Sequence, residues 1–338
     1  MSKKLQDQLL DEIISRFPKR KDAVEVLTKL LGIQQDAIYR RLRGGTQLTP
    51  DEIALLTKTF NLSLDSLIYK ESDTVFFNFT PFSNTVNNVG DYLNEVLKDL
   101  LQVNQLPDVH IHYVSYEIPF FYYAFFPELI SFKLFIWGKT VWDFGYLKDK
   151  LFDFDIISYP DEKIIQDILK NFLCLPTTEI WSVNIIDNTL SQIEYFVNTG
   201  GFKNPTDAYV LCDKMQLLVT QWRKMAAHGK KFPLGDYSEE RAQSDFNLYQ
   251  QELLISSNTI LVTSAATKII YPIISNPNYL RSNDQRMCEY QEEWFKKAIS
   301  KSTYISSQNE KTRSLFFNIM EKKIAATRRR IESHLEEY

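Results

Sequence analysis

Cysteine is scarce and scattered in this sequence of 338 residues. The chain has three, Cys174, Cys212 and Cys288, and no Cys-x-x-Cys pair. An odd number at wide spacing argues against a disulfide framework, and it also argues against metal or redox chemistry at cysteine. We therefore expect a protein of a reducing compartment, the cytoplasm.

Long apolar runs are missing as well. The most hydrophobic stretch, residues 118–142, is interrupted by Pro119, Pro127, Glu128, Lys133 and Lys139, so no run of about 18 apolar residues survives to span a membrane. An aromatic-rich core segment is the better interpretation. The first residues do not resemble a secretory signal, because they lead into an amphipathic helix with inward Leu9, Leu10, Ile13, Ile14 and Phe17.

The motifs of common enzyme sites are also lacking. Neither G-x-x-x-x-G-K-[ST] nor G-x-G-x-x-G occurs, and Gly200-Gly201 follows a predicted helix, where a C-cap explains the pair more simply than a phosphate cradle. His110 and His112 share one face of a predicted strand, but no nearby Cys or acidic pair completes a metal site, so a structural role is favoured. We expect no catalytic residues, no metal and no cofactor.

Charge is unevenly distributed along the chain, whose net charge is −4. Residues 1–70 hold 12 Lys and Arg against 9 Asp and Glu, a net +3, which leaves 27 against 34, a net −7, for the rest. The N-terminal end is therefore the one that can approach phosphate. Because a weakly basic module binds DNA poorly alone, we expect a homodimer that engages two half-sites.

Residues 22–44 predict two short helices separated by a tight break. Asp22 suits an N-cap, and an inward apolar stripe follows: Ala23, Val26, Leu27, Leu30 and Leu31. Gly32 stands where the first helix must end, because a left-handed residue costs least without a Cβ. Ile33 then fills the angle between the helices.

The second helix of the pair has one apolar and one polar face. Ala37, Ile38 and Leu42 point inward, and the outward or terminal positions are Gln34, Gln35, Asp36, Tyr39, Arg40 and Arg43. Gln pairs well with adenine, Arg with guanine or phosphate, and Tyr donates to phosphate. The outward set is chemically suited to a base edge and its flanking backbone.

Residues 19–69 resemble the lambda-repressor-like (Cro-type, xenobiotic-response-element) family of helix-turn-helix regulators. The matching pattern is Leu31-Gly32-Ile33, a polar helix start, Ile38, Arg43-Gly44, a helix opened by Thr49-Pro50-Asp51-Glu52, and Leu64 to Leu67. The resemblance implies a five-helix DNA-binding domain in which Gln34 and Gln35 start the recognition helix. It further implies that Asp36, Tyr39 and Arg40 face the groove, with Arg43 and Thr46 near phosphate.

One departure from the family bears on mechanism. Asp36 puts a negative charge where the family often has a neutral polar residue; it either caps the helix start, which is favoured, or accepts from a cytosine amino group. Some repressors of this family carry a self-cleaving peptidase half with a cleavable Ala-Gly linker. The chain contains no Ala-Gly dipeptide, so we set that mechanism aside.

The remainder of the chain predicts a second, larger domain. A polar joint at residues 70–73 places the boundary near residue 72, giving domains 1–71 and 72–338, with Val75–Phe79 as a strand or a docked arm. Helices are expected at 88–101, 161–172, 188–197, 205–228, 283–300 and 308–336, a strand at 109–114, and a hairpin from 253–262 and 267–274. The fold class is mainly α, with a mixed, helix-rich α+β C-terminal part.

Two features of this larger domain have alternative interpretations. Twelve aromatic residues fall within positions 120–146; they form a core, the favoured interpretation, or line an apolar pocket for a small molecule or peptide. The last helix has an apolar stripe of Phe317, Met320, Ile324, Ile331 and Leu335, which packs against a twin or against its own domain. Its basic run Arg328-Arg329-Arg330 is expected to be a solvated face.

The sequence thus predicts a cytoplasmic transcriptional regulator that binds a roughly palindromic operator in double-stranded DNA as a dimer. Its C-terminal domain would dimerise and sense a small-molecule or peptide effector. A non-enzymatic protein-interaction adaptor is the first alternative. A peptide-responsive regulator of the quorum-sensing type is the second, although the predicted strands and the lack of an internal repeat speak against its helical-repeat architecture.

Overall fold

The chain folds as two compact units, Met1–Phe76 and Phe77–Tyr338. The structure, a computed structural model, describes residues 4–17, 19–60, 62, 64–68, 74–79, 86–253 and 258–336. The predicted boundary near residue 72 and the polar joint at 70–73 lie outside the described residues. Just after them, the main chain of Asn78 exchanges two hydrogen bonds with that of Arg281, so the last part of the predicted extended arm pairs within the second unit.

The described part of the N-terminal unit consists of five short helices. They are α1 (Leu5–Ser15), α2 (Arg20–Leu31), α3 (Gln35–Leu42), α4 (Pro50–Thr59) and α5 (Leu64–Ile68). All of them contribute to one small core, whose buried members include Leu9, Leu27, Ile38, Leu56 and Leu67. The first helix and its inward residues Leu9, Leu10 and Ile13 are as the sequence predicts.

Helix α2 differs from the prediction at its start and in its buried face. Lys19 holds the N-cap position, so Asp22 lies in the first turn, where the helix dipole favours its carboxylate although it caps nothing. Val24 is buried and Val26 is 39% exposed, which reverses the expected order. The sequence pattern alone does not distinguish the two valines, because they are equally apolar; in the structure it is Val24 that packs in the core of the unit.

The C-terminal unit contains a mixed seven-stranded sheet in the order β6-β5-β4-β1-β2-β3-β7. The strands are β1 (His110–Ser115), β2 (Thr177–Trp181), β3 (Phe246–Gln250), β4 (Thr259–Thr263), β5 (Lys268–Ser275), β6 (Asn278–Tyr279) and β7 (Thr303–Tyr304). Strands β1, β2 and β3 run parallel, and every other neighbouring pair is antiparallel. The predicted fold class, mainly helical with an α+β C-terminal part, is confirmed.

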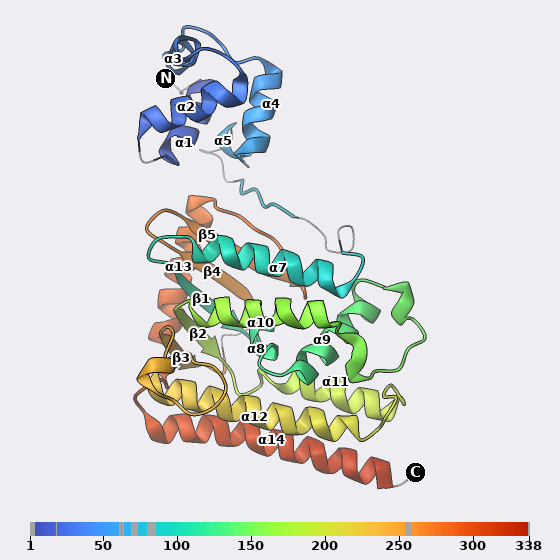
Figure 1. Ribbon diagram of the computed structural model, residues 1–338. Helices are drawn as coiled ribbons and strands as arrows, with labels where there is room; N and C mark the ends of the chain where they lie inside the picture. The colour runs from blue at the N-terminus through green and yellow to red at the C-terminus, as the bar shows by residue number, and fades with distance from the viewer. Residues whose placement is uncertain are drawn as a thin grey trace. The chain divides into compact units, whose positions relative to one another are not determined.

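Helices cover both faces of this sheet (Figure 1). The described α-helices of this unit are α7 (Val89–Asn104), α8 (Phe120–Tyr123), α9 (Pro127–Thr140), α10 (Tyr159–Leu173), α11 (Asp187–Asn198), α12 (Asp207–His228), α13 (Gln285–Ser300) and α14 (Glu310–Glu336). Alternate residues of each strand point to opposite faces. Ile111, Trp181 and Phe246 join the large core with α7 to α12, whereas Val114 and Ile180 pack against Phe295 of α13.

Most predicted elements of this unit are present within a few residues of their expected bounds. The hairpin is confirmed as β4 and β5, although Leu253 lies outside β4 and residues 254–257 are outside the described part. Strands β2 and β3 were not predicted. Each is only five residues long, and β2 carries the buried Glu179 at its centre, which breaks the apolar pattern of a central strand.

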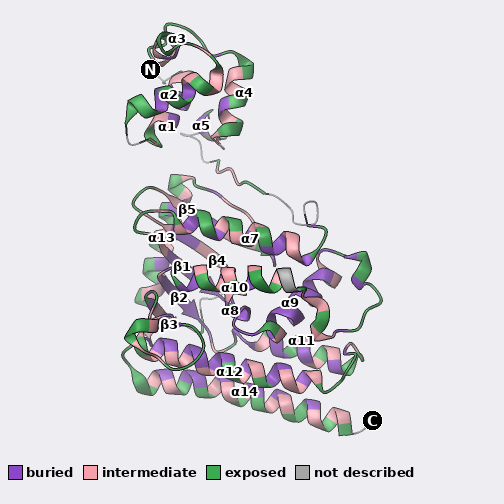
Figure 2. Cartoon of the chain, in the orientation of Figure 1, coloured by how far each residue is buried: buried purple, intermediate pink, exposed green. Residues whose placement is uncertain are grey.

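Nine of the twelve rings of the aromatic-rich segment are buried in the core, the favoured interpretation, whereas Phe120 and Phe121 are half-buried and line a pocket, and Tyr146 is exposed. Helix α9 is buried from Leu129 through Gly138 on all its sides, which Figure 2 shows as continuous purple. A helix that is apolar all round belongs in the interior of a domain. No helix in the described residues combines the length and hydrophobicity that a transmembrane span requires.

The last helix packs on its own unit. Phe317, Met320, Ile324 and Ile331 are buried, and α14 lies along α12 and α11 (Figure 1). This apolar stripe is therefore not free to pair with a twin. Within the predicted basic run, Arg328 pairs with Asp213 and Glu332, and Arg330 pairs with Glu194, which makes it a solvated, charge-paired face.

All three cysteines are free. Burial raises the pKa of Cys212 to about 12 and that of Cys288 to about 11, and Cys174 is exposed. Buried thiols with raised pKa values are poor nucleophiles and poor metal ligands.

His110 and His112 lie side by side on the face of β1 that packs against α13. Their ring centroids are 4.8 Å apart, and the ring of Phe295 is 5.5 Å from that of His112. Within the described residues no group of three or more His, Cys, Asp and Glu side chains is arranged to hold a metal. Burial is the main cause that lowers the pKa of His112 to about 4, and its Nδ1 has no hydrogen-bond partner among the described residues.

We predict that His112 makes the C-terminal unit sensitive to mild acid. The folded state keeps this imidazole neutral while the unfolded chain binds a proton below pH 6.5, so stability falls between pH 6.5 and about 4. His112→Leu should remove roughly 2 kcal/mol of that loss. Urea unfolding at several pH values, followed by tryptophan fluorescence, measures it, since all five tryptophans lie in this unit. Parallel pH dependences in the two proteins would contradict this role.

Candidate nucleic-acid interface

The turn between α2 and α3 is formed by a left-handed glycine. Gly32 has φ +65°, and its N–H donates to the carbonyl of Thr28 at 3.0 Å, which closes the last turn of α2. Helix α3 begins three residues later, and the N–H groups of Ala37 and Ile38 donate to the carbonyl of Gln34. The helix break that the sequence places at Gly32 is confirmed.

Helix α3 is anchored through its inward side. Ile38 is 2% exposed and lies in the core of the unit, and Leu42 packs against the same core. Tyr39 also packs there and is half-buried, so its ring is not fully outward as the sequence suggested. The orientation of the helix is set by these contacts.

The opposite side of α3 and the turn after it present polar side chains to solvent. Six of the seven predicted contact residues are exposed: Gln34, Gln35, Asp36, Arg40, Arg43 and Thr46. Positions 36, 40 and 43 recur at helical spacing, so their side chains project on one side of the element. We call these six residues, with the edge of Tyr39, the α3 face.

Asp36 does not cap the helix. Gln34 holds the N-cap position of α3, where no side chain makes a capping hydrogen bond, and Asp36 lies within the first turn. A carboxylate there is favoured by the helix dipole. The expectation of a capping role is therefore wrong, and the Asp36 carboxylate is exposed at the start of the α3 face.

Gln6 of α1 holds the turn after α3, a role that the sequence did not reveal. Its Nε2 donates to the carbonyls of Arg41 at 2.8 Å and Thr46 at 2.9 Å, and its Oε1 accepts from the N–H of Leu48 at 2.7 Å. One amide side chain thus fixes both ends of the loop that carries Arg43. An isolated Gln in an amphipathic helix carries no pattern that could have indicated this.

A half-buried ion pair links α3 to α4. Arg41 donates to Glu52 Oε1 at 2.7 Å, while Glu52 Oε2 accepts from the N–H of Thr49 at 2.8 Å in the capping box that opens α4. Burial alone would raise the pKa of Glu52, but the Thr49 N–H and the Arg41 guanidinium together lower it. The sequence indicates the capping box, but it does not indicate that Glu52 of this box also pairs with Arg41.

The α3 face is chemically equipped for a polar, anionic partner. Two neutral amides, two guanidinium groups, a hydroxyl and one carboxylate, that of Asp36, are exposed, whereas the third arginine of this region, Arg41, is used internally. Amides and guanidinium groups read base edges, and guanidinium and hydroxyl groups bind phosphate. Helix α3 has eight residues, about 12 Å, a length that fits within a major groove.

Comparisons with models of protein families, with curated proteins and with solved structures found no significant match. The likeness to the Cro-type regulators consequently rests on the ordered residue pattern of positions 19–69. The structure adds one observation to this pattern, the left-handed glycine turn between α2 and α3.

Replacing Gly32 should destabilise the N-terminal unit selectively. Gly32→Ala meets no atom within 4 Å, so its cost comes from the left-handed backbone alone, about 1 kcal/mol. Hydrogen–deuterium exchange of the full chain measures it, with faster exchange expected in peptides from α2 and α3. Tryptophan fluorescence would not report this unit, because all five tryptophans lie beyond it.

Gly45→Ala is the matched control for this substitution. Its φ is not positive, and an added Cβ would make ordinary contact with the carbonyl of Arg40 at 3.5 Å. It should leave exchange in α2 unchanged. Equal acceleration by both substitutions would show that the conformation of Gly32 is not what holds the turn.

Proposed function

We propose that this protein is a cytoplasmic transcriptional regulator that binds a specific operator in double-stranded DNA through the α3 face. The observation that supports this most is a helix fixed by Ile38 behind a glycine turn, with Gln35, Asp36, Arg40 and Arg43 all exposed on its other side. Such a helix presents its first residues to base edges while its end and the following turn contact phosphate. The role is binding, without catalysis.

The proposal includes a homodimer on a roughly palindromic site. The first 70 residues carry only +3 net charge, so one unit makes few phosphate contacts, and joining two units raises the affinity without new contacts to each half-site. The apolar stripe of α14 is occupied within its own unit, so the dimer contact would have to use another surface. The larger unit is the proposed site of dimerisation and effector sensing.

A protein-interaction adaptor is the competing proposal. It draws support from three apolar side chains that the N-terminal unit leaves at least 39% exposed, Val26, Leu55 and Ile68. The dependence of binding affinity on salt concentration distinguishes the two functions. Phosphate contacts make log affinity fall steeply with log salt concentration, whereas an apolar docking surface does not lose affinity in this way. A helical-repeat peptide receptor is not supported, because the larger unit contains a seven-stranded sheet.

Removing two side chains of the α3 face should abolish specific DNA binding. Gln35→Ala together with Arg40→Ala deletes two base-reading groups worth about 2 to 6 kcal/mol together, a loss of at least about thirtyfold in affinity. Gel-shift assays of the full chain against genomic fragments measure the loss as disappearance of the specific band. An unchanged sequence preference would contradict the assignment of α3.

Lys58→Ala is the matched control, because it removes one positive charge far from α3. Gln6, near the start of α1, contacts the loop after α3, whereas Arg16, just beyond the end of α1, donates to the carbonyl of Phe60. The eleven residues of α1 separate these contacts by about 16 Å. Lys58 precedes Phe60 by two residues and is exposed, so it lies near the Arg16 end of α1, away from the loop after α3. It should be dispensable for the specific band.

A further inference from the structure

A cavity of about 110 Å³ lies between α7 and the sheet of the C-terminal unit. Its walls are mostly apolar and come from α7, the segment around α8, and strands β4 and β5; they include Tyr92, Val96, Phe120, Phe121, Ile260 and Tyr271. The surrounding rings are themselves well packed, with Phe121 stacked on Phe172 at 4.6 Å. The space is partly open, and because its walls are closely packed it keeps a defined shape into which a small molecule can fit.

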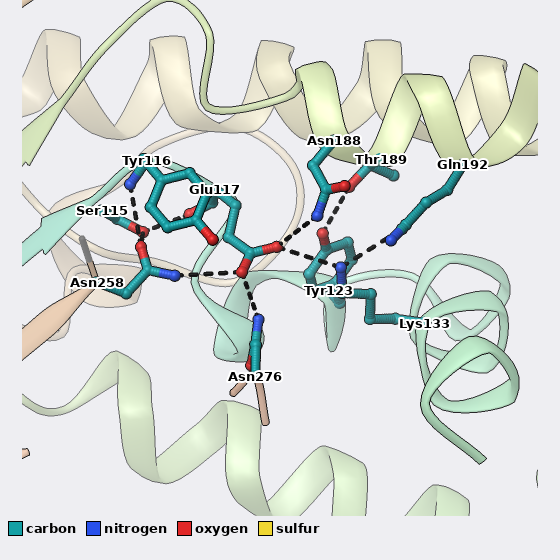
Figure 3. A network of polar contacts seen from close by, with 10 residues as sticks. All are labelled: Ser115, Tyr116, Glu117, Tyr123, Lys133, Asn188, Thr189, Gln192, Asn258 and Asn276. Atoms are coloured by element: carbon teal, nitrogen blue, oxygen red, sulfur yellow. Dashed lines mark hydrogen bonds and ion pairs between the residues drawn. The ribbon is translucent and has the colours of Figure 1, made fainter. Parts of the chain in front are cut away.

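Two amide side chains on the wall of this cavity are held by a buried carboxylate. Glu117 is 3% exposed, and its Oε1 accepts from Nδ2 of Asn258 at 3.2 Å and from Nδ2 of Asn276 at 2.5 Å (Figure 3). On the side away from the cavity, Oε2 of Glu117 accepts from Asn188 at 2.8 Å and from Lys133 at 3.4 Å. The buried charge is thus satisfied by the protein itself.

This network fixes what the two amides offer to the cavity. A carboxylate accepts only, so Asn258 and Asn276 must both turn their NH₂ groups toward Glu117. The Oδ1 of Asn258 already accepts from Ser115 Oγ and from the N–H of Tyr116. Among the described residues no group donates to Oδ1 of Asn276, which leaves a carbonyl acceptor on a mostly apolar wall.

Charge decides which kind of molecule suits the space. Asp99 also lines the cavity, where it accepts a hydrogen bond from the hydroxyl of Tyr279. With Asp99 on the wall and Glu117 behind it, an anionic ligand would be repelled. An apolar cavity of about 150 Å³ in another protein binds benzene, so a single ring is the upper size here. We infer that the cavity binds a small, neutral, single-ring aromatic molecule that donates one hydrogen bond to Asn276 Oδ1, as a phenol does.

This binding site stands independently of the DNA-binding proposal; only the use of the ligand as an effector rests on it. Phenol is the probe, and the full chain is titrated without DNA by calorimetry, with tryptophan fluorescence as a second readout. Trp137 and Trp142 lie 5.8 and 4.9 Å from the ring of Tyr92 on the cavity wall. Binding of phenol at millimolar concentration and no binding of benzoate are expected. No binding of phenol, or equal binding of benzoate, would overturn the inference.

Two substitutions locate the site. Val96→Phe fills the cavity and should abolish phenol binding, while retained binding would place the ligand elsewhere. Asn276→Ala keeps the space and removes the acceptor, so phenol affinity should fall by about fivefold to tenfold, with toluene binding unchanged. The second variant keeps the test decisive if the first does not fold.

Asn188→Ala is the matched control for Asn276→Ala. It also removes one amide from Glu117, but Asn188 does not line the cavity. Phenol affinity should be unchanged in this variant. An equal loss in both variants would mean that disturbance of the Glu117 network, and not contact with the ligand, lowers the affinity, and the inference would be wrong.

Discussion

The proposed function depends on one backbone conformation, the left-handed turn at Gly32. Because α2 ends there and α3 begins three residues later, Ile38 enters the same small core as Leu27 and Leu56. Burial of Ile38 fixes the rotation of α3 about its axis. The polar residues at positions 35, 36, 40 and 43 are then exposed as a geometric consequence.

The turn after α3 is held by polar contacts and by burial of Leu48 in the core of the N-terminal unit. Gln6 binds both ends of the loop, and the Arg41–Glu52 pair ties α3 to the capping box of α4. Of three neighbouring arginines, the structure uses Arg41 internally and leaves Arg40 and Arg43 exposed. A division of this kind separates the residue that positions the helix from those that can contact a partner.

Two of the buried charged residues in the described part of the larger unit are carboxylates, Glu117 and Glu179. Glu117 is satisfied by three Asn side chains and Lys133, and Glu179 accepts from Tyr122 and from the indole of Trp181. Burial raises the pKa of Glu179 and lowers that of Lys133. Such groups are costly unless fully hydrogen-bonded, and at Glu117 the same bonds orient the amides on the cavity wall.

Sequence reasoning succeeded where a local pattern determines the structure. The five helices of the first unit, the break at Gly32, the capping box at Thr49 and the β4–β5 hairpin all have short-range signals. It failed where tertiary contacts decide, as in the choice of Val24 over Val26, the buried strand around Glu179, and the contacts of Gln6. The seven predicted contact residues follow a local pattern of polar residues on one side of a short helix and in the turn after it. Six of them are exposed and Tyr39 is partly drawn into the core, and their contact with DNA stays a prediction.

Selection from a random duplex library with the full-length protein tests the central claim most directly, because the selection itself identifies the operator sequence. The account predicts enrichment of an inverted repeat whose half-site centres are separated by about one helical turn, roughly 10 base pairs, or a multiple of it. A pool that stays random, while the protein remains folded by its tryptophan fluorescence and by hydrogen exchange of α2 and α3, would contradict it.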